Sequence, residues 1–148
     1  MLGARPMLEA DLPTVMAIEE QAYPHPWSRG IFEDCLRVKA YECLVYEDGN
    51  DLCAYSVMSW GAGEAHLLNL CVRPERQGQG LGRAVLEQVI QLARDKTASN
   101  LFLEVRLSNR AARHLYESAG FNEIGRRFDY YPAHNGREDA LVFALPLL

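Results

Sequence analysis

The stretch Gln77-Gly78-Gln79-Gly80-Leu81-Gly82-Arg83 stands between a segment that alternates like a strand and one that repeats like a helix. Its three glycines have no Cβ atom, so the main chain can take φ/ψ values that other residues avoid and can bring N–H groups close to a ligand. Unpaired N–H groups at a helix start, together with the helix dipole, favour an anion such as a pyrophosphate. The stretch therefore predicts a binding site for a phosphorylated cofactor.

The segments on either side of this stretch fit that interpretation. Residues 64–72 alternate over part of their length and end before Pro74, which predicts a strand. Residues 80–94 carry apolar side chains at the 3.6-residue period, which predicts a helix. The glycines therefore occupy the turn from a strand into a helix.

Two well-known phosphate-binding motifs do not match the spacing. The P-loop requires lysine and then serine or threonine after its last glycine, whereas Arg83-Ala84 follows Gly82. The dinucleotide fingerprint G-x-G-x-x-G would require a glycine at position 83. The stretch does match Q-x-x-G-x-G, which resembles the acyl-coenzyme A pyrophosphate loop of the Gcn5-related N-acetyltransferase (GNAT) superfamily. On local spacing alone, an ordinary tight turn remains the alternative.

Length and composition indicate one soluble domain over residues 1–148. The chain has 148 residues, 49% hydrophobic and 24% charged, with a net charge of -5. A chain of this length can bury a sizeable core. Its basic residues are dispersed, which does not favour nucleic-acid binding. The negative charge either favours a cationic acceptor or only keeps the protein soluble.

Cysteine, histidine and apolar content indicate the compartment. No segment has the length of a membrane span, and the N-terminus lacks the apolar core of a secretory signal. The cysteines lie in apolar runs without C-x-x-C spacing and the histidines are far apart, so buried thiols and no metal site are expected. We therefore expect a cytoplasmic protein that contacts neither membranes nor nucleic acid directly. The cysteines are Cys35, Cys43, Cys53 and Cys71.

The order of predicted elements indicates an α/β fold of the mixed α+β kind. Asp11 is expected to cap a first helix, Ser28 a second, and Asp48-Gly49 to join two strands in a hairpin. This order predicts a mixed, mostly antiparallel central sheet with helices on both faces. It matches the GNAT layout, which implies two central parallel strands that splay apart to admit the cofactor's pantetheine arm. Besides 64–72 and 80–94, the predicted helices are 11–23, 28–36 and 109–119, and the strands 41–46, 52–59, 100–105, 121–128 and 138–145.

Acid–base chemistry is the next expectation. An amine that attacks a thioester needs a base, and the departing thiolate benefits from an acid. Glu104, near the carboxyl end of a predicted strand, is the candidate base, with a solvated glutamate as the alternative. Tyr116 is the candidate acid because a phenol has a pKa near 10, with burial in an apolar stripe as the alternative. Asn109 begins the same helix and either caps it or reaches the cofactor.

Seven segments of the chain, taken together, resemble a subfamily of the GNAT superfamily, the ribosomal-protein-alanine N-acetyltransferases. This resemblance covers nearly the whole chain. This implies direct transfer from acetyl-coenzyme A, as co-substrate, to the N-terminal α-amine, expected to be alanine, of a ribosomal small-subunit protein. We expect a monomer without a metal. The segments that carry the resemblance are 24–28, 69–72, 77–83, 103–109, 115–121, 130–132 and 136–140.

The resemblance also implies a role for individual residues. Glu104 would be the general base and Tyr116 the general acid. Trp27 and Tyr131 would border the acceptor groove, with anchoring of their loops as the alternative. The residues implied to bind acetyl-coenzyme A are Leu70, Cys71, Val72, Gln77, Gly78, Gln79, Gly80, Leu81, Gly82, Arg83 and Asn109.

Two other functions stay open at this point. The first is a broader N-terminal, lysine or small-amine acetyltransferase. The second is a non-catalytic acyl-coenzyme A-binding regulatory module, against which the presence of both Glu104 and Tyr116 argues. The thiol of Cys71 would lie next to the thioester, but no nearby histidine in the sequence activates it.

Overall fold

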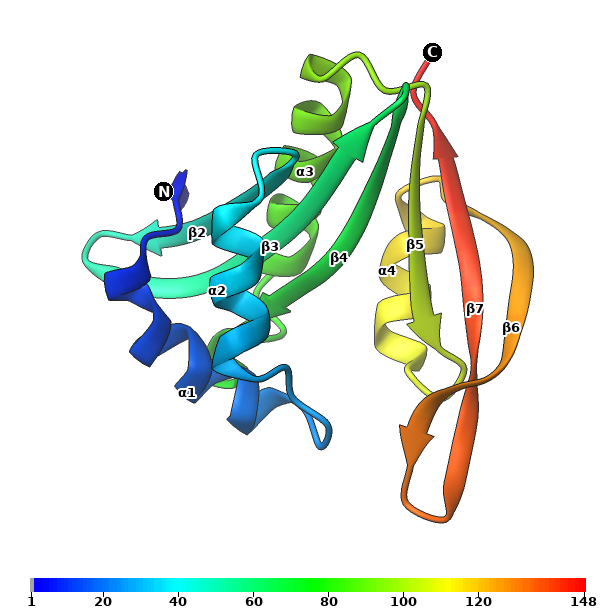
Figure 1. Ribbon diagram of the computed structural model, residues 1–148, viewed down its shortest axis with the longest axis horizontal. Coiled ribbons are helices and arrows are strands. Elements are labelled where there is room, and N and C mark those ends of the chain that lie inside the picture. Colours follow the sequence, from blue (N-terminus) through cyan, green and yellow to red (C-terminus); the bar gives the residue numbers. More distant parts are fainter. Residues whose placement is uncertain (1) are drawn as a thin grey trace.

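A computed structural model describes residues 2–148 as a seven-stranded mixed sheet flanked by four α-helices (Figure 1). The spatial order of the strands is β1-β2-β3-β4-β5-β7-β6. The strands are β1 (Leu2–Pro6), β2 (Tyr41–Asp48), β3 (Asp51–Gly61), β4 (Glu64–Val72), β5 (Asn100–Arg106), β6 (Asn122–Ala133) and β7 (Gly136–Pro146). The helices are α1 (Leu12–Ala22), α2 (Arg29–Arg37), α3 (Leu81–Asp95) and α4 (Arg110–Ser118), with 3₁₀ turns η1 (Glu9–Asp11) and η2 (Pro74–Arg76).

The sheet opens between its two parallel strands. β4 and β5 pair only from Glu64 with Asn100 to Leu67 with Leu103, whereas the other strand pairs are antiparallel. A register shift between β3 and β4 leaves Leu68 without a partner directly after the last parallel pair. Such a bulge bends its strand and increases the twist, so β4 and β5 diverge beyond it (Figure 1). The predicted splay of two parallel strands is therefore confirmed.

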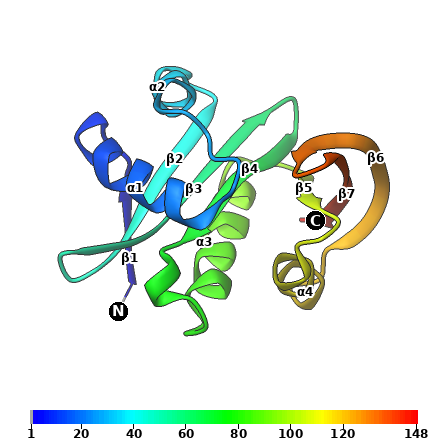
Figure 2. The ribbon, with the colours of Figure 1, turned by 90° about the horizontal axis from the view of Figure 1, so that it is seen from below.

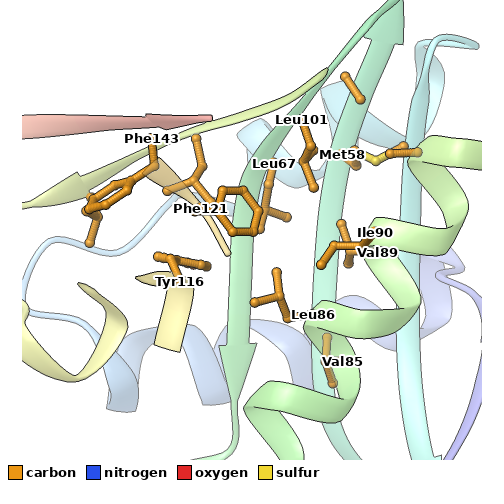
Figure 3. Packing of buried hydrophobic residues seen from close by; sticks show 14 of the residues in the cluster. Met58, Leu67, Val85, Leu86, Val89, Ile90, Leu101, Tyr116, Phe121 and Phe143 are labelled. Carbon is orange, nitrogen blue, oxygen red and sulfur yellow. The ribbon is translucent and has the colours of Figure 1, made fainter. Parts of the chain in front are cut away.

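Two apolar cores sandwich the sheet. α1 and α2 cover one face and α3 and α4 the other, as Figure 2 shows. Apolar side chains of α3 at helical spacing, among them Val85 and Val89, pack on Leu67 and Leu101 from β4 and β5 (Figure 3). The second cluster joins Val15 and Ile18 of α1 to Phe32 of α2 and to Tyr55 and Val57 of β3. Residues that alternate along β4 and β5 therefore point to different faces.

Local capping signals agree with the structure at two of three positions. Ser28 Oγ accepts a hydrogen bond from Ile31 N at 3.3 Å, and Asn109 Oδ1 accepts one from Ala112 N at 3.1 Å. The expected cap by Asp11 is wrong. Its carboxylate accepts from Leu8 N at 2.8 Å and pairs with Arg5, so it closes the preceding turn η1 and not the first turn of α1.

The ends of the sheet differ from the expected boundaries. The edge strand β1 was not predicted, because its residues are mostly exposed and it joins the sheet through main-chain pairing with β2. β6 and β7 extend further than expected, and β6 accommodates the extra length through register shifts at Glu123/Gly125 and Arg127/Tyr131. The four cysteines are buried and free, as expected. Among residues 2–148 no helix has the length and apolarity needed to cross a membrane.

Candidate active site

The glycine-rich stretch leaves a run of main-chain donors free. Gly78 and Gly80 have φ of 78° and 80°, and nothing lies within 4 Å of a Cβ built at either position. Gln77 N, directly after η2, donates to Pro74 O at 3.3 Å, and the next paired main-chain N–H is that of Ala84, which donates to Gly80 O at 3.2 Å. Within the described chain, the N–H groups of residues 78–83 therefore make no hydrogen bond. Six donors at the start of α3 form a site for an anion.

Side chains of the same stretch hold its shape. Gln77 Nε2 donates to Val72 O at 3.1 Å, which ties the loop to the end of β4. Gln79 Oε1 accepts from Arg76 Nε at 3.2 Å. Arg83 reaches across to α4, where its Nη1 donates to Ser118 Oγ at 3.2 Å. These polar side chains fix the loop and leave its main chain to face a ligand.

The splayed part of β4 forms the wall beside this loop. Tyr23, directly after α1, donates its hydroxyl to Leu70 O at 3.0 Å, and Val72 is buried in the α3/α4 core. Cys71 is buried on the other face, where desolvation raises the pKa of its thiol to about 11 although Tyr55 and Tyr23 lower it. A thiol protonated at neutral pH is a poor nucleophile, so the chemistry has to come from other groups.

The side chain of Glu104 points away from the α3/α4 core, to the face of the sheet that α1 and α2 cover. Its neighbours Leu103 and Val105 are buried in that core, so alternation along β5 directs Glu104 to the opposite face. Its side chain is only 10% exposed. The Oε2 atom is buried and makes no hydrogen bond within the described chain. Glu104 lies one residue beyond the last parallel pair, so it is an enclosed carboxylate at the splay and not a solvated one.

His66 of β4 is a neighbour of Glu104 that sequence reasoning missed. Its Nε2 lies 2.8 Å from Glu104 Oε2, a contact that is an ion pair only if the imidazole is protonated, and that oxygen makes no hydrogen bond within the described chain. His66 also lines a cavity of about 200 Å³ together with Ser59 and Glu64. No local pattern joins the two residues, because they come from different strands.

Tyr116 approaches from α4, on the other face of the sheet. The residue is 8% exposed, and its ring packs against Phe121 with 5.6 Å between centroids (Figure 3). The predicted apolar stripe is therefore confirmed. Burial, followed by the charge of Tyr131, raises the pKa of the Tyr116 phenol above its usual range. This hydroxyl stays protonated at neutral pH and is available as a donor.

The two aromatic residues expected near an acceptor have different surroundings. Burial, and then the negative charge of Glu104, raise the pKa of Tyr131 to about 12. The Arg106 guanidinium stacks over the Tyr131 ring at 4.5 Å from its centroid. Trp27 is half-buried, with its ring 5.2 Å from that of Phe32. The charge of Glu104 therefore acts on Tyr131, whereas the ring of Trp27 packs on the apolar cluster formed by α1, α2 and β3.

The fold and the site together define the class of protein. A mixed sheet that opens at a single parallel pair, beside a glycine-rich helix start with free N–H groups, is the architecture expected of a GNAT acetyltransferase. Residues 12–121 match the sequence model of the acetyltransferase (GNAT) family, and the chain belongs to this family. The expected class of enzyme is confirmed.

Particular relatives narrow the class further. The chain is 42% identical over 137 residues to the ribosomal protein bS18-alanine N-acetyltransferase of Escherichia coli strain K12, which covers 93% of this chain and 92% of that enzyme. The Haemophilus influenzae protein of the same name is 37% identical over 135 residues, with 90% and 91% covered. The crystal structure of the Escherichia coli enzyme has a TM-score of 0.92 at 39% identity, covering 99% of this chain and 94% of that chain.

The acetyl donor is acetyl-coenzyme A, as expected from the sequence. The Salmonella typhimurium protein yncA, solved with its cofactor acetyl-CoA, shares the fold with a TM-score of 0.84 at 19% identity, covering all of this chain and 95% of that chain. The chain fits such a ligand, because its six unpaired N–H groups can donate hydrogen bonds to the oxygens of a pyrophosphate. Open space at Gly78 and Gly80 lets that group approach the main chain.

Proposed function

We propose that the protein transfers the acetyl group of acetyl-coenzyme A to the N-terminal alanine amine of a ribosomal small-subunit protein. The relatives that cover most of this chain carry this activity in their names. The observation that carries the proposal is the enclosed carboxylate of Glu104 at the splay, whose Oε2 makes no hydrogen bond within the described chain and lies 2.8 Å from His66 Nε2. A buried carboxylate oxygen gains from a donor that a ligand supplies.

On the acceptor side, Glu104 would take the proton that the attacking amine loses, directly or through water. An N-terminal amine has a pKa of about 8, so much of it is protonated at neutral pH and needs a base. Arg106, two residues after Glu104, pairs with Glu138 at 3.0 Å and stacks on the Tyr131 ring. Its guanidinium is therefore occupied by these two residues and does not pair with the carboxylate of Glu104. The amine would arrive on the face of the sheet to which Glu104 points.

On the donor side, Tyr116 would give its proton to the departing thiolate. Its helix lies on the face opposite to that of Glu104, so acid and base approach the splay from two sides. This arrangement suits a direct attack, in which the amine enters on one side of the thioester carbonyl and the thiolate leaves on the other. The free N–H groups of residues 78–83 would hold the pyrophosphate and set the depth of the acetyl group.

The acceptor assignment is tested by thiol release from acetyl-coenzyme A with a peptide that copies the ribosomal N-terminus. We expect turnover with the free alanine amine and none with the same peptide already acetylated. A peptide whose only free amine is a lysine side chain should react at least about tenfold more slowly, because its amine is mostly protonated, with a pKa near 10.4. Equal rates for the alanine and lysine peptides would contradict the N-terminal assignment.

The cofactor loop is tested by Gly80→Ala. An alanine held at φ of 80° is strained, and relaxation of the turn would misdirect the N–H groups of residues 78–83. We expect acetyl-coenzyme A to bind about tenfold more weakly by calorimetry, which corresponds to the loss of about one charge-assisted hydrogen bond.

The matched control for this loop is Gly49→Ala. Gly49 has φ of 64° in the β2–β3 turn and equally open space around a Cβ. Both variants should lose about 1 kcal/mol of stability from the left-handed conformation. Only Gly80→Ala should lose cofactor affinity, and equal losses of affinity in both variants would contradict the assignment of the loop.

A further inference from the structure

Glu19 of α1 is the one charged side chain that is fully buried among residues 2–148, with 2% exposure. It stands on the inward face of the helix beside Val15 and Ile18. Burying a carboxylate is costly, and an apolar side chain of similar size would pack there at lower cost. The cost is offset only where hydrogen bonds satisfy the buried carboxylate.

Three neutral donors from three different segments converge on this carboxylate. Trp27 N donates to Oε2 at 2.9 Å, and Tyr55 Oη donates to Oε1 at 2.7 Å. Asn69 Nδ2 also donates to Oε1, at 3.1 Å. Acceptance at both oxygens is the hydrogen bonding of an ionised carboxylate. Glu19 therefore links the α1–α2 loop to β3 and β4.

The contact on β4 falls at the point where the sheet opens. Asn69 follows the bulged residue Leu68 and lies beyond the last parallel pair at Leu67. One helical turn after Glu19, Tyr23 donates to the carbonyl of Leu70 at 3.0 Å. Glu19 in the last turn of α1 and Tyr23 directly after it thus hold the splayed part of β4 from the same side to which Glu104 points.

We propose that Glu19 is a positioning residue that keeps the α1–α2 loop, residues 23–28, in register with the splayed part of β4, so that binding of the acceptor depends on it. The proposal rests on the proposed function, because it takes the acceptor to enter beside Glu104. Glu19 would act through Trp27 N on the loop and through Asn69 on the strand. It touches neither reactant.

Glu19→Gln separates the two connections. The amide keeps the shape but has one acceptor oxygen, so its NH₂ group must face either Trp27 N or the pair of donors from Tyr55 and Asn69. With the NH₂ group toward Trp27, the amide oxygen still accepts from Tyr55 and Asn69, and only the Trp27 N–H is left unmatched. In the opposite orientation the Tyr55 hydroxyl has to turn to accept from the amide, and the Asn69 NH₂ group is left unmatched. The first orientation needs the smaller rearrangement and is therefore expected, which releases the loop and keeps β4 in place.

The expected result is a KM for the acceptor peptide raised at least tenfold, with acetyl-coenzyme A affinity within twofold of wild type. Glu20→Gln is the matched control, because Glu20 is the next residue of α1 and is exposed. It should leave both quantities unchanged. An equal weakening of peptide and cofactor binding by Glu19→Gln would show a general structural role and overturn the proposal.

A second readout does not depend on activity. In a Trp60→Phe background Trp27 is the remaining tryptophan, and Trp60 Nε1 makes no hydrogen bond within the described chain, so this background removes none. Release of the loop by Glu19→Gln should shift Trp27 emission to longer wavelength. Unchanged Trp27 emission in a folded variant overturns the proposal. This readout requires no acetylation of a peptide, so it separates a failure of this proposal from a failure of the proposed function.

If Glu19→Gln does not fold, Asn69→Ala carries the test. It removes one donor from a half-buried position and leaves Trp27 N and Tyr55 on the carboxylate. Glu19 is then less firmly held, and we expect the peptide KM to rise by a smaller factor, about threefold. A peptide KM equal to that of wild type in Asn69→Ala would overturn the coupling between the loop and the strand.

Discussion

Glu104→Gln is expected to lower kcat by about 10²–10⁴-fold, the usual contribution of a general base. Glutamine keeps the volume and the position of the side chain on β5 but has no site that accepts a proton at neutral pH. Acetyl-coenzyme A affinity should stay within about twofold, because the free N–H groups of residues 78–83 are untouched. Steady-state thiol release at saturating concentrations of both substrates measures the loss.

The pH dependence of this variant identifies the missing step. Without its base, the enzyme depends on amine that solvent has already deprotonated, so the rate of Glu104→Gln should rise with pH up to the amine pKa of about 8. Glu64→Gln is the control, because Glu64 is an exposed glutamate of β4 that lines the same cavity as His66. A folded Glu104→Gln enzyme with kcat within threefold of wild type would refute the assignment of the base.

Local features of this fold were predictable because the residues that cause them are neighbours in sequence. Gly78 and Gly80 take the left-handed φ that their spacing indicates, and Ser28 and Asn109 cap the helices that follow them. The α3 stripe forms because its apolar residues repeat with the helical period. Asp11 is the exception. Its carboxylate accepts a hydrogen bond from Leu8 N and pairs with Arg5, so it does not cap α1.

Contacts across the fold were not predictable from pattern. The bond from Tyr55 to Glu19 spans 36 residues, and the bond from Asn69 to Glu19 spans 50. His66 reaches Glu104 only because β4 and β5 are adjacent parallel strands. An alternating strand has two sides, and the sequence alone leaves open which side meets solvent. The resemblance supplied the role of Glu104, whereas the enclosure of its carboxylate follows from the geometry.

Tyr116→Phe is the second change with a large expected effect, a fall in kcat of about 10²–10⁴-fold. Phenylalanine keeps the edge-on contact with Phe121 at 5.6 Å, so the fold should survive. The thiolate would have to leave without a proton donor. Tyr46→Phe is the control, since it also removes a buried hydroxyl from the α3/α4 core, the one bonded to Ser56 Oγ at 2.8 Å. It should lower stability and leave kcat unchanged.

The pH profile of the wild-type enzyme tests whether burial keeps the Tyr116 acid active. Desolvation disfavours the phenolate, so the pKa of Tyr116 lies above its usual value. A donor of raised pKa stays protonated to higher pH, so its activity is lost only above the ordinary phenol pKa of about 10. We therefore expect kcat to reach a plateau above the pKa of the amine, without a decline up to pH 10. The deficit of Tyr116→Phe should be constant along that plateau. A wild-type decline centred below pH 10 that is absent from Tyr116→Phe would show that Tyr116 titrates as an exposed phenol.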